Sequence, residues 1–192
     1  MESMFAACCS LTSIDLSSFN TENVVDMNHM FQECSSLTLI DLSNFNTEKV
    51  TNMRRKFYDC TSVTSIDLSN FNTEKVTSMG NMFHSCSSLI SIDLSNFNTK
   101  NVRNMGGMFK SCTSLTAINL SNFTSEKVDN VMNMLDSCSS LTSIDLSNFI
   151  INDVIRTFDF SGLPEKGNIT INYKSKDKFW GIPSKWKIKY VN

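Results

Sequence analysis

The chain has 192 residues, a formal net charge of −2 and 41% hydrophobic residues. This length is enough for one domain with a sizeable core. The small net charge gives no strong field that would favour nucleic acid or a membrane surface. No apolar run is long enough to span a membrane. Residues 1–5 lack the basic start and apolar stretch of a signal peptide.

A unit of 26 residues recurs through most of the chain without an insertion. Three sets of residues fall 26 positions apart: Cys8, Cys34, Cys60, Cys86, Cys112 and Cys138; Ile14, Ile40, Ile66, Ile92, Ile118 and Ile144; Phe19, Phe45, Phe71, Phe97, Phe123 and Phe149. A strict period in this range is typical of a solenoid, in which each unit buries its apolar face against the next.

Each unit is predicted to contain a short strand and a short helix. In residues 34–59, Leu37-x-x-Ile40-x-Leu42 indicates a bend and then a strand, because apolar and polar residues alternate. Residues at helical spacings of three and four follow: Val50, Met53, Phe57 and Cys60. Asn52 or Thr51 would cap a short helix and Thr47 a longer one; the short helix is favoured because Val50-Thr51 has weak helix propensity.

The first copy opens in the middle of a unit, since Met4-Phe5-x-x-Cys8 aligns with Met30-Phe31-x-x-Cys34. We expect either a fragment of a longer protein or a first strand that is left uncapped. An open N-terminal end would allow an oligomer to form there.

The second copy departs from the pattern with three basic residues, Arg54, Arg55 and Lys56. They indicate either an anion site or a solvated helix face. Lys56 stands where other copies have Met, so its stem is expected to reach outward from the core. Gly80, Gly106 and Gly107 are expected to weaken the helices that contain them.

The repeat pattern fails after Phe149, so we expect one structural domain with six repeats in 1–158 and a C-terminal cap in 159–192. In the cap, residues 169–173 and 186–190 alternate as strands do, and 176–180 indicate a helical turn. Residues 1–149 have a net charge of −6, whereas residues 150–192 have a net charge of +4. The lysines of the cap either give it a polar outer face or form a basic docking patch.

The pattern L-x-x-I-x-L-x-x-F followed by M-F-x-x-C resembles the BspA-like leucine-rich repeats of bacterial surface proteins. The motif Cys-Ser-Ser-Leu-Thr-Ser-Ile-Asp-Leu-Ser-Asn-Phe is similar to the repeats of their 26-residue subgroup. The resemblance covers residues 3 to 160. It implies an α/β leucine-rich-repeat-like solenoid with a parallel sheet on one face and short helices on the other. It also implies a non-enzymatic surface or adhesion role and a cell-surface or secreted location.

The repeating cysteines have three interpretations. Neighbouring copies would lie about 5 Å apart, within the Cα range for a disulfide. Soft-metal binding is disfavoured because no ligands cluster at C-x-x-C spacing. An odd count of seven fits a disulfide framework poorly, so we predict buried free thiols that act as small apolar residues.

An acidic column is predicted on the outward side of the strands. It either attracts cations or a basic partner, or forms a solvated acidic surface. Neighbouring carboxylates should repel and raise some of their pKa values. The column consists of Asp15, Asp41, Asp67, Asp93, Asn119 and Asp145.

The helix side varies more between copies than the strand face does. A spacer has no reason to vary at outward positions, whereas a binding module should vary where it touches its partner. The candidate ligand-binding residues on this side are Arg54, Arg55, Tyr58, His84 and Lys110.

No catalytic or phosphate-binding motif of the kinds G-x-S-x-G and G-x-x-x-x-G-K is present, so we expect no enzyme, metal or cofactor. The leading prediction is a surface binding or adhesion module whose partner is a host or matrix protein or another cell-surface molecule. Neither nucleic acid nor membrane insertion is expected. The alternative is a structural spacer or stalk with no ligand of its own.

Overall fold

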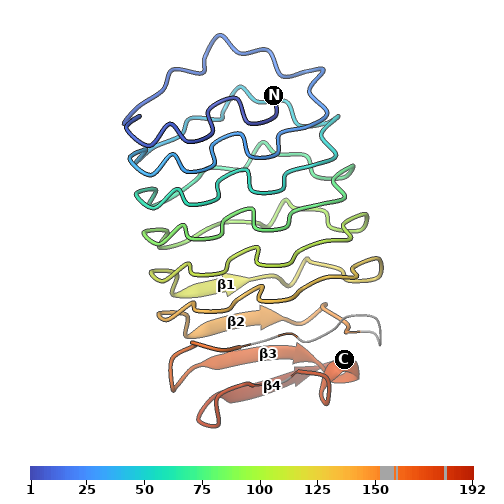
Figure 1. Cartoon of the computed structure of the whole chain (residues 1–192). Helices are drawn as coiled ribbons and strands as arrows, with labels where there is room; N and C mark the ends of the chain where they lie inside the picture. The colour runs from blue at the N-terminus through green and yellow to red at the C-terminus, as the bar shows by residue number, and fades with distance from the viewer. Residues whose placement is uncertain (152–157, 159, 180) are drawn as a thin grey trace.

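The computed structural model describes residues 1–151, 158, 160–179 and 181–192. The chain winds into a stack of coils, and each coil of the repeat region is built from one 26-residue unit (Figure 1). Every coil has a strand side, which carries the segments 13–17, 39–43, 65–69, 91–95, 117–121 and 143–147. It also has a turn side, which carries residues 3–7, 29–33, 55–59, 81–85, 107–111 and 133–137. Residues at the same position of successive coils form a column.

The strand side ends in a four-stranded parallel sheet in the order β1-β2-β3-β4. The strands are β1 (Ala117–Asn119), β2 (Ser143–Leu146), β3 (Asn168–Asn172) and β4 (Lys187–Val191). Ile118 pairs with Ile144, Ile144 with Ile169, and Ile169 with Ile188. A parallel sheet is therefore confirmed, and the strands predicted in the cap continue it as two further members.

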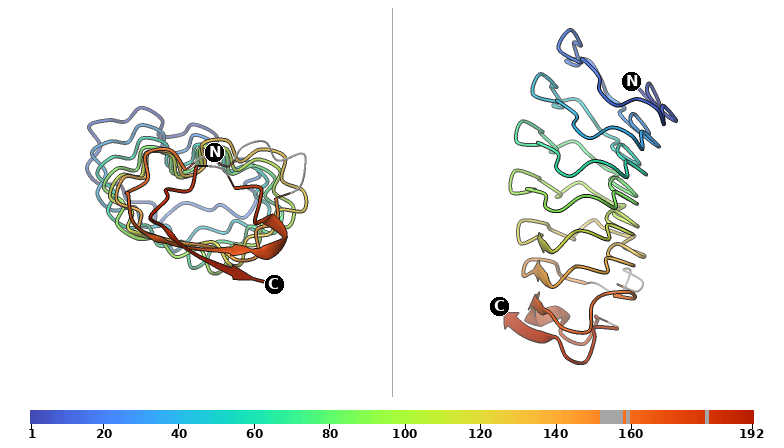
Figure 2. Two further views of the ribbon diagram at one scale, coloured as in Figure 1. Left: turned by 90° about the horizontal axis from the view of Figure 1, so that it is seen from below. Right: turned by 90° about the vertical axis from the view of Figure 1, so that its left-hand side faces the viewer.

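A strand in every copy is not observed. The segments 13–17, 39–43, 65–69 and 91–95 form no strand, although their alternation is as predicted: Ile40 and Leu42 are buried, and Asp41 and Ser43 are exposed. In this N-terminal half the coils lie further apart on the strand side than on the turn side (Figure 2). Side chains rather than a backbone ladder therefore connect the strand sides of these coils.

One connection is an asparagine column at the end of each strand segment. The amide nitrogen of Asn70 donates to three carbonyls of the preceding coil, those of Leu42 at 3.0 Å, Ser43 at 3.2 Å and Phe45 at 2.9 Å. Asn44, Asn96 and Asn122 make the same three bonds. One side chain thus satisfies three carbonyls that a closed sheet would have paired.

A second connection is a buried hydroxyl column. The Thr73 hydroxyl donates to the Asn98 carbonyl at 3.1 Å and accepts from the Asn98 amide at 2.8 Å. Thr21, Thr47, Thr99 and Ser125 bridge to the next coil in the same way. All five are almost fully buried. Each hydroxyl replaces a backbone partner inside the stack, so its loss would leave two groups unsatisfied.

The helices predicted for the opposite face are wrong. The described residues contain one helical element, the 3₁₀ helix η1 (Tyr173–Ser175), which lies near the C-terminus. On the turn side, the amides of Met53, Arg55, Phe57 and Asp59 donate to carbonyls of the next coil at 2.8–3.0 Å. The intervening amides of Lys56, Tyr58 and Cys60 close turns to the residue three positions earlier. An α-helix would instead satisfy these groups within one segment.

Two residues per coil, four positions apart, have positive φ on the turn side. The later copies place Asn81, Ser85, Gly107, Ser111, Asn133 and Ser137 there, with φ between 56° and 62°. Asn and Gly adopt this conformation at low cost, and two such residues per turn segment interrupt a right-handed helix. Asn52 was a candidate helix cap. Its side-chain oxygen instead accepts a hydrogen bond from the Arg54 amide, which closes a short turn.

The core runs the length of the stack between the two sides. Phe5, Phe31, Phe57, Phe83 and Phe109 stack face to face with ring centroids 5.4–5.8 Å apart. The buried thiols of Cys34, Cys60, Cys86, Cys112 and Cys138 each donate at 3.1 Å to a Phe carbonyl of the preceding coil. The predicted burial of free cysteine is confirmed for these five, whereas Cys8 and Cys9 are exposed.

Lys56 is inside this core, so the prediction that its stem reaches outward is wrong. Its side chain is fully buried, and its amino group lies 5.1–5.5 Å from the ring centres of Phe31, Phe45, Phe57 and Phe71. Burial among apolar groups lowers the pKa of Lys56 to about 7. The Lys56 side chain points into the core, as the methionines of the same column do. These are Met30, Met82, Met108 and Met134.

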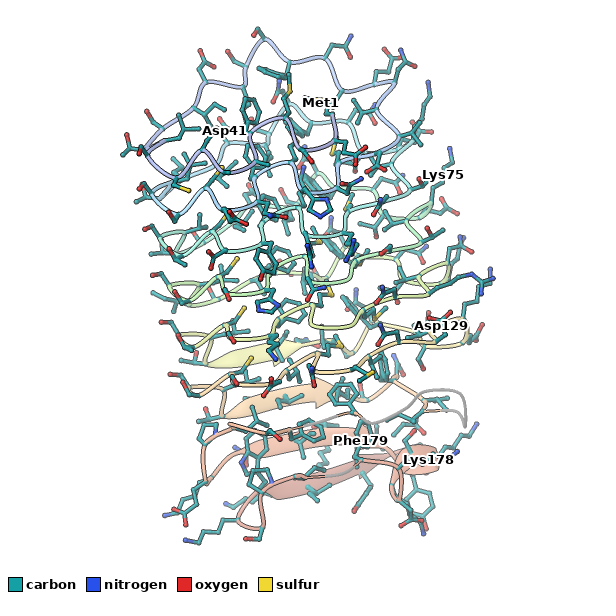
Figure 3. All side chains as sticks on the ribbon, in the orientation of Figure 1. Met1, Asp41, Lys75, Asp129, Lys178 and Phe179 are labelled. Atoms are coloured by element: carbon teal, nitrogen blue, oxygen red, sulfur yellow. The ribbon has the colours of Figure 1, made fainter. Side chains whose placement is uncertain are left out.

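The C-terminal segment covers the last repeat. The helical turn predicted for 176–180 is displaced to η1, and Trp180 lies outside the described residues. Charged side chains such as Lys75 and Asp129 lie at the edge of the coils, outside the core (Figure 3). The described residues contain no helix of the length and apolar character needed to cross a membrane.

Candidate functional site

The acidic column on the strand side consists of turn-capping carboxylates. The Oδ1 atoms of Asp15, Asp41, Asp67, Asp93 and Asp145 each accept from the amide of the Ser two residues later at 2.9 Å. Asn119 does the same with Ser121 at 3.0 Å. An uncharged amide thus performs this role, so the column selects a hydrogen-bond acceptor rather than a charge.

The raised pKa values predicted for this column are wrong. The pKa values of Asp41, Asp67 and Asp93 are lowered, first by the backbone amide of the following Ser and then by its hydroxyl. For Asp15 the Ser17 hydroxyl comes first and the amide second. Hydrogen bonds to the ionised form outweigh repulsion between neighbours, because these carboxylates face solvent.

The strand side also contains hollows between its separated coils. One hollow has a volume of about 350 Å³ and lies between two neighbouring coils. It is lined by Asp67 and Asp93 and by Ser65, Ile66, Leu68, Ser69, Ser95 and Asn96. The described residues show no group of three or more His, Cys, Asp or Glu side chains able to hold a metal ion. The acidic column therefore provides shallow, open clefts in which each carboxylate already has a protein partner.

On the turn side, the structure brings the predicted residues together. The Arg55 guanidinium lies 5.2 Å from the centre of the Tyr58 ring, and the Tyr58 and His84 rings lie 4.7 Å apart. His84 also bonds to the Asn81 side chain at 3.1 Å. Tyr58, His84 and Lys110 occupy one column in three successive coils, so the inter-coil spacing sets these contacts. Lys56, expected beside Arg54 and Arg55, is instead in the core.

A polar hollow of about 330 Å³ lies beside this cluster, within the range of small-ligand pockets. Three of the predicted residues, Arg54, His84 and Lys110, line it. Sequence reasoning missed the rest of the lining: Asn81, Asn104, Gly106, Gly107, Asn130, Met132 and Asn133. The available signal was the Gly106-Gly107 pair, which stands where the preceding coil has Gly80-Asn81 and the following coil has Met132-Asn133.

We name this cavity, defined by the ten lining residues, the glycine hollow. A Cβ atom at Gly107 would lie 2.3 Å from the Asn81 side-chain oxygen, and one at Gly106 would lie 2.8 Å from the Asn130 side-chain nitrogen. The two glycines therefore let the Asn81 and Asn130 side chains approach the backbone more closely than a Cβ atom would allow. Gly107 also has a positive φ of 62°, which its column shares with Asn81 and Asn133.

The electrostatics of the glycine hollow are weakly positive. Lys110 is paired with Asp136 at 2.8 Å, and no ion pair to Arg54 or Arg55 is seen among the described residues. The buried Nε atom of Arg55 has no hydrogen-bond partner there. Burial, followed by the charges of Lys110 and Arg55, lowers the pKa of His84, so its imidazole is neutral at pH 7.

Comparison with protein families gives a match that covers most of the chain. A model described as "Mycoplasma protein of unknown function, DUF285" matches residues 1–89 and again residues 60–163. The chain belongs to this family. The two overlapping DUF285 matches agree with a repeat protein whose units continue across the middle of the chain. Searches of curated proteins and of solved structures gave no match.

Proposed function

We propose that this DUF285 chain is a non-catalytic repeat scaffold that acts as a surface binding or adhesion module, with the glycine hollow as its binding site. The observation that carries the proposal is the local break in the repeat. The two neighbouring coils have Asn81 and Asn133 in the column where Gly107 stands, and a hollow with Arg54, His84 and Lys110 on its wall lies at this position. A scaffold selected for stacking alone has no need of such a gap.

The proposal extends to family and location. The Leu-x-x-Ile-x-Leu and Met-Phe-x-x-Cys patterns support the 26-residue BspA-like subgroup of leucine-rich repeats. That resemblance supports a cell-surface or secreted location and a partner such as a host or matrix protein or another cell-surface molecule. The regular columns of the strand side support the alternative, a spacer, since Asn44, Asn70, Asn96 and Asn122 make the same bonds in four successive coils.

The test separates a binding module from a spacer. Beads that carry the chain at controlled density are washed over animal-cell monolayers and over extracellular matrix, beside beads coated with albumin. A binding module retains beads above the albumin level, and retention falls as soluble chain is added in excess. Retention equal to albumin on every surface contradicts the proposal and leaves the spacer.

A further inference from the structure

The chemistry of the glycine hollow is that of a site for a small, hydroxyl-rich anion. Its wall holds two basic side chains, those of Arg54 and Lys110, and the imidazole of His84. Asp136 bonds to Lys110 and compensates one of these charges. The Arg54 guanidinium, which is exposed, has no ion-pair partner among the described residues and is available to a ligand.

Four asparagines add hydrogen-bonding groups around the cations. The Oδ1 atoms of Asn104 and Asn130 accept from the Gly106 amide at 2.9 Å and the Met132 amide at 3.0 Å. These bonds fix the two side chains and leave their NH₂ groups as donors. Asn81 and Asn133 also line the hollow, and a side-chain amide can both donate and accept hydrogen bonds.

Apolar anchors are scarce in this lining. Among the ten residues, Met132 is the large apolar side chain, and it is 53% exposed. Protein and peptide partners are held mainly by buried aromatic and aliphatic anchors, which this site does not provide. Hydroxyl groups next to a carboxylate or sulfate match a lining of amides and cations better than a peptide does.

From this we infer that the glycine hollow binds an acidic sugar, the charged unit of a glycan that carries a carboxylate or a sulfate ester. The inference rests on the proposed function and names its ligand class. In this arrangement Arg54 and Lys110 face the anionic group, and Asn81, Asn104, Asn130 and Asn133 bond to the ring hydroxyls.

The first experiment is a titration of the ¹⁵N-labelled chain followed by amide NMR shifts. The probes are glucuronic acid, N-acetylneuraminic acid and glucose 6-sulfate, with glucose and sodium acetate as controls. We expect saturable shifts at the amides of Gly106 and Gly107 with an acidic sugar, at least tenfold weaker binding of both controls, and weakening with added salt. The carboxylate and sulfate probes identify the anionic group. Equal binding of acetate reduces the site to a general anion site and overturns the inference, as does the absence of shifts.

Two variants test the site itself. Gly106→Met with Gly107→Asn introduces the pair that the next coil carries at positions 132 and 133, so it places two side chains in the hollow. The positive φ of Gly107 suits Asn, as it does at Asn81 and Asn133, and the ends of the Asn81 and Asn130 side chains must shift to admit the new Cβ atoms. This double variant should weaken sugar binding at least tenfold. Arg54→Gln removes the charge without filling the space and should weaken binding about as much. Leu39→Ser is the matched control and should bind like the parent chain. Leu39 is exposed on the strand side, and the same column has Ser65 and Ser91 in the next two coils.

The outcomes also distinguish this inference from the proposed function. If beads are retained on cells or matrix but no acidic sugar binds, the module binds surfaces and the ligand class is wrong. If the filled variant binds sugar as well as the parent does, the hollow is not the site. If acidic sugars bind in solution and beads are not retained, the inference holds and the adhesion role fails.

Discussion

The amino group of Lys56 lies 3.3 Å from the sulfur of Met27, in a core where other coils have Met in the column of Lys56. Four aromatic rings surround the same group, and no carboxylate contributes to its pKa. Aromatic faces attract a cation but replace only part of its lost hydration. The protein therefore has one coil with a charge-sensitive interior.

Lys56→Met should stabilise the protein, and most strongly at low pH. The folded-state pKa of Lys56 is lowered to about 7, so the unfolded chain binds more protons between pH 7 and its ordinary pKa of about 10.5. The destabilising contribution of Lys56 is therefore complete below pH 7 and decreases as the pH rises toward 10.5. The shift corresponds to a difference on the order of 5 kcal/mol at pH 6. Urea unfolding of both proteins at pH 6, 7 and 8 measures it.

The reciprocal change is the control for Lys56. Met82→Lys places the same side chain one coil later and should lower the stability of the chain at pH 6 by a similar amount. A Lys56→Met variant no more stable than the parent at any of the three pH values would contradict the buried amino group.

Thr73→Val should destabilise the stack because it removes a hydroxyl that serves both the amide and the carbonyl of Asn98. An unsatisfied buried group costs about 1–3 kcal/mol, and we expect a total loss of about 2–4 kcal/mol in urea unfolding. Thr73→Ser keeps the hydroxyl, as Ser125 does in the same column, and should lose much less. A larger loss for Ser than for Val would show that the methyl group, not the hydroxyl bridge, stabilises the coil.

Asp67→Asn should leave the urea midpoint at pH 7 nearly unchanged, whereas Asp67→Ala should lower it. Asn can accept from the Ser69 amide as Asn119 does from Ser121, but Ala cannot. An Asp67→Asn/Asp93→Asn variant more stable than the parent at pH 7 would show that repulsion dominates the column after all.

Acidification should weaken the fold through the same column. The pKa values of Asp15, Asp41, Asp67 and Asp93 are lower in the folded chain than their ordinary values. Their stabilising contribution is therefore present above the ordinary value of about 3.9 and is lost as the pH falls through the lowered values. The pH dependence of unfolding between pH 5 and 2 should be reduced in the double Asn variant.

Cysteine labelling should divide the seven thiols into two groups. Cys8 and Cys9 are exposed and should react within the mixing time of a maleimide assay. Burial raises the pKa of Cys34 to about 11 and that of Cys138 to about 12, and places those of Cys86 and Cys112 well above the ordinary value. Mass spectrometry should find the five buried thiols unlabelled until urea unfolds the chain. Rapid labelling of Cys86 in the folded chain would rule out the buried column.

The repeat, its inward residues and the parallel sheet could be predicted from the sequence because periodicity reports which side chains face the core. Val50, Met53, Phe57 and Cys60 do face inward, but a chain of turns places them there as well as a helix would. The deciding information was the backbone of His29, Arg55, Asn81 and Gly107, all with positive φ, which side-chain spacing does not report.

The candidate site was predictable in part. Variation among copies pointed to Arg54, Arg55, Tyr58, His84 and Lys110, and the structure brings them together. The rest of the lining is largely Gly106, Gly107 and four asparagines, which a search for reactive side chains does not register. The outward direction predicted for the Lys56 stem is wrong because its charge was weighed above the Met column that it occupies.

The bonds of the asparagine and hydroxyl columns join each coil to its immediate neighbour alone, with partners 25 to 28 positions away in sequence. Removing or duplicating exactly one unit would therefore restore every such bond with the next equivalent residue. At the level of the gene, recombination between copies keeps both reading frame and register, so coil number can change in a single event. Lineages that gain or lose coils in this way would vary in reach while keeping the same stacking chemistry.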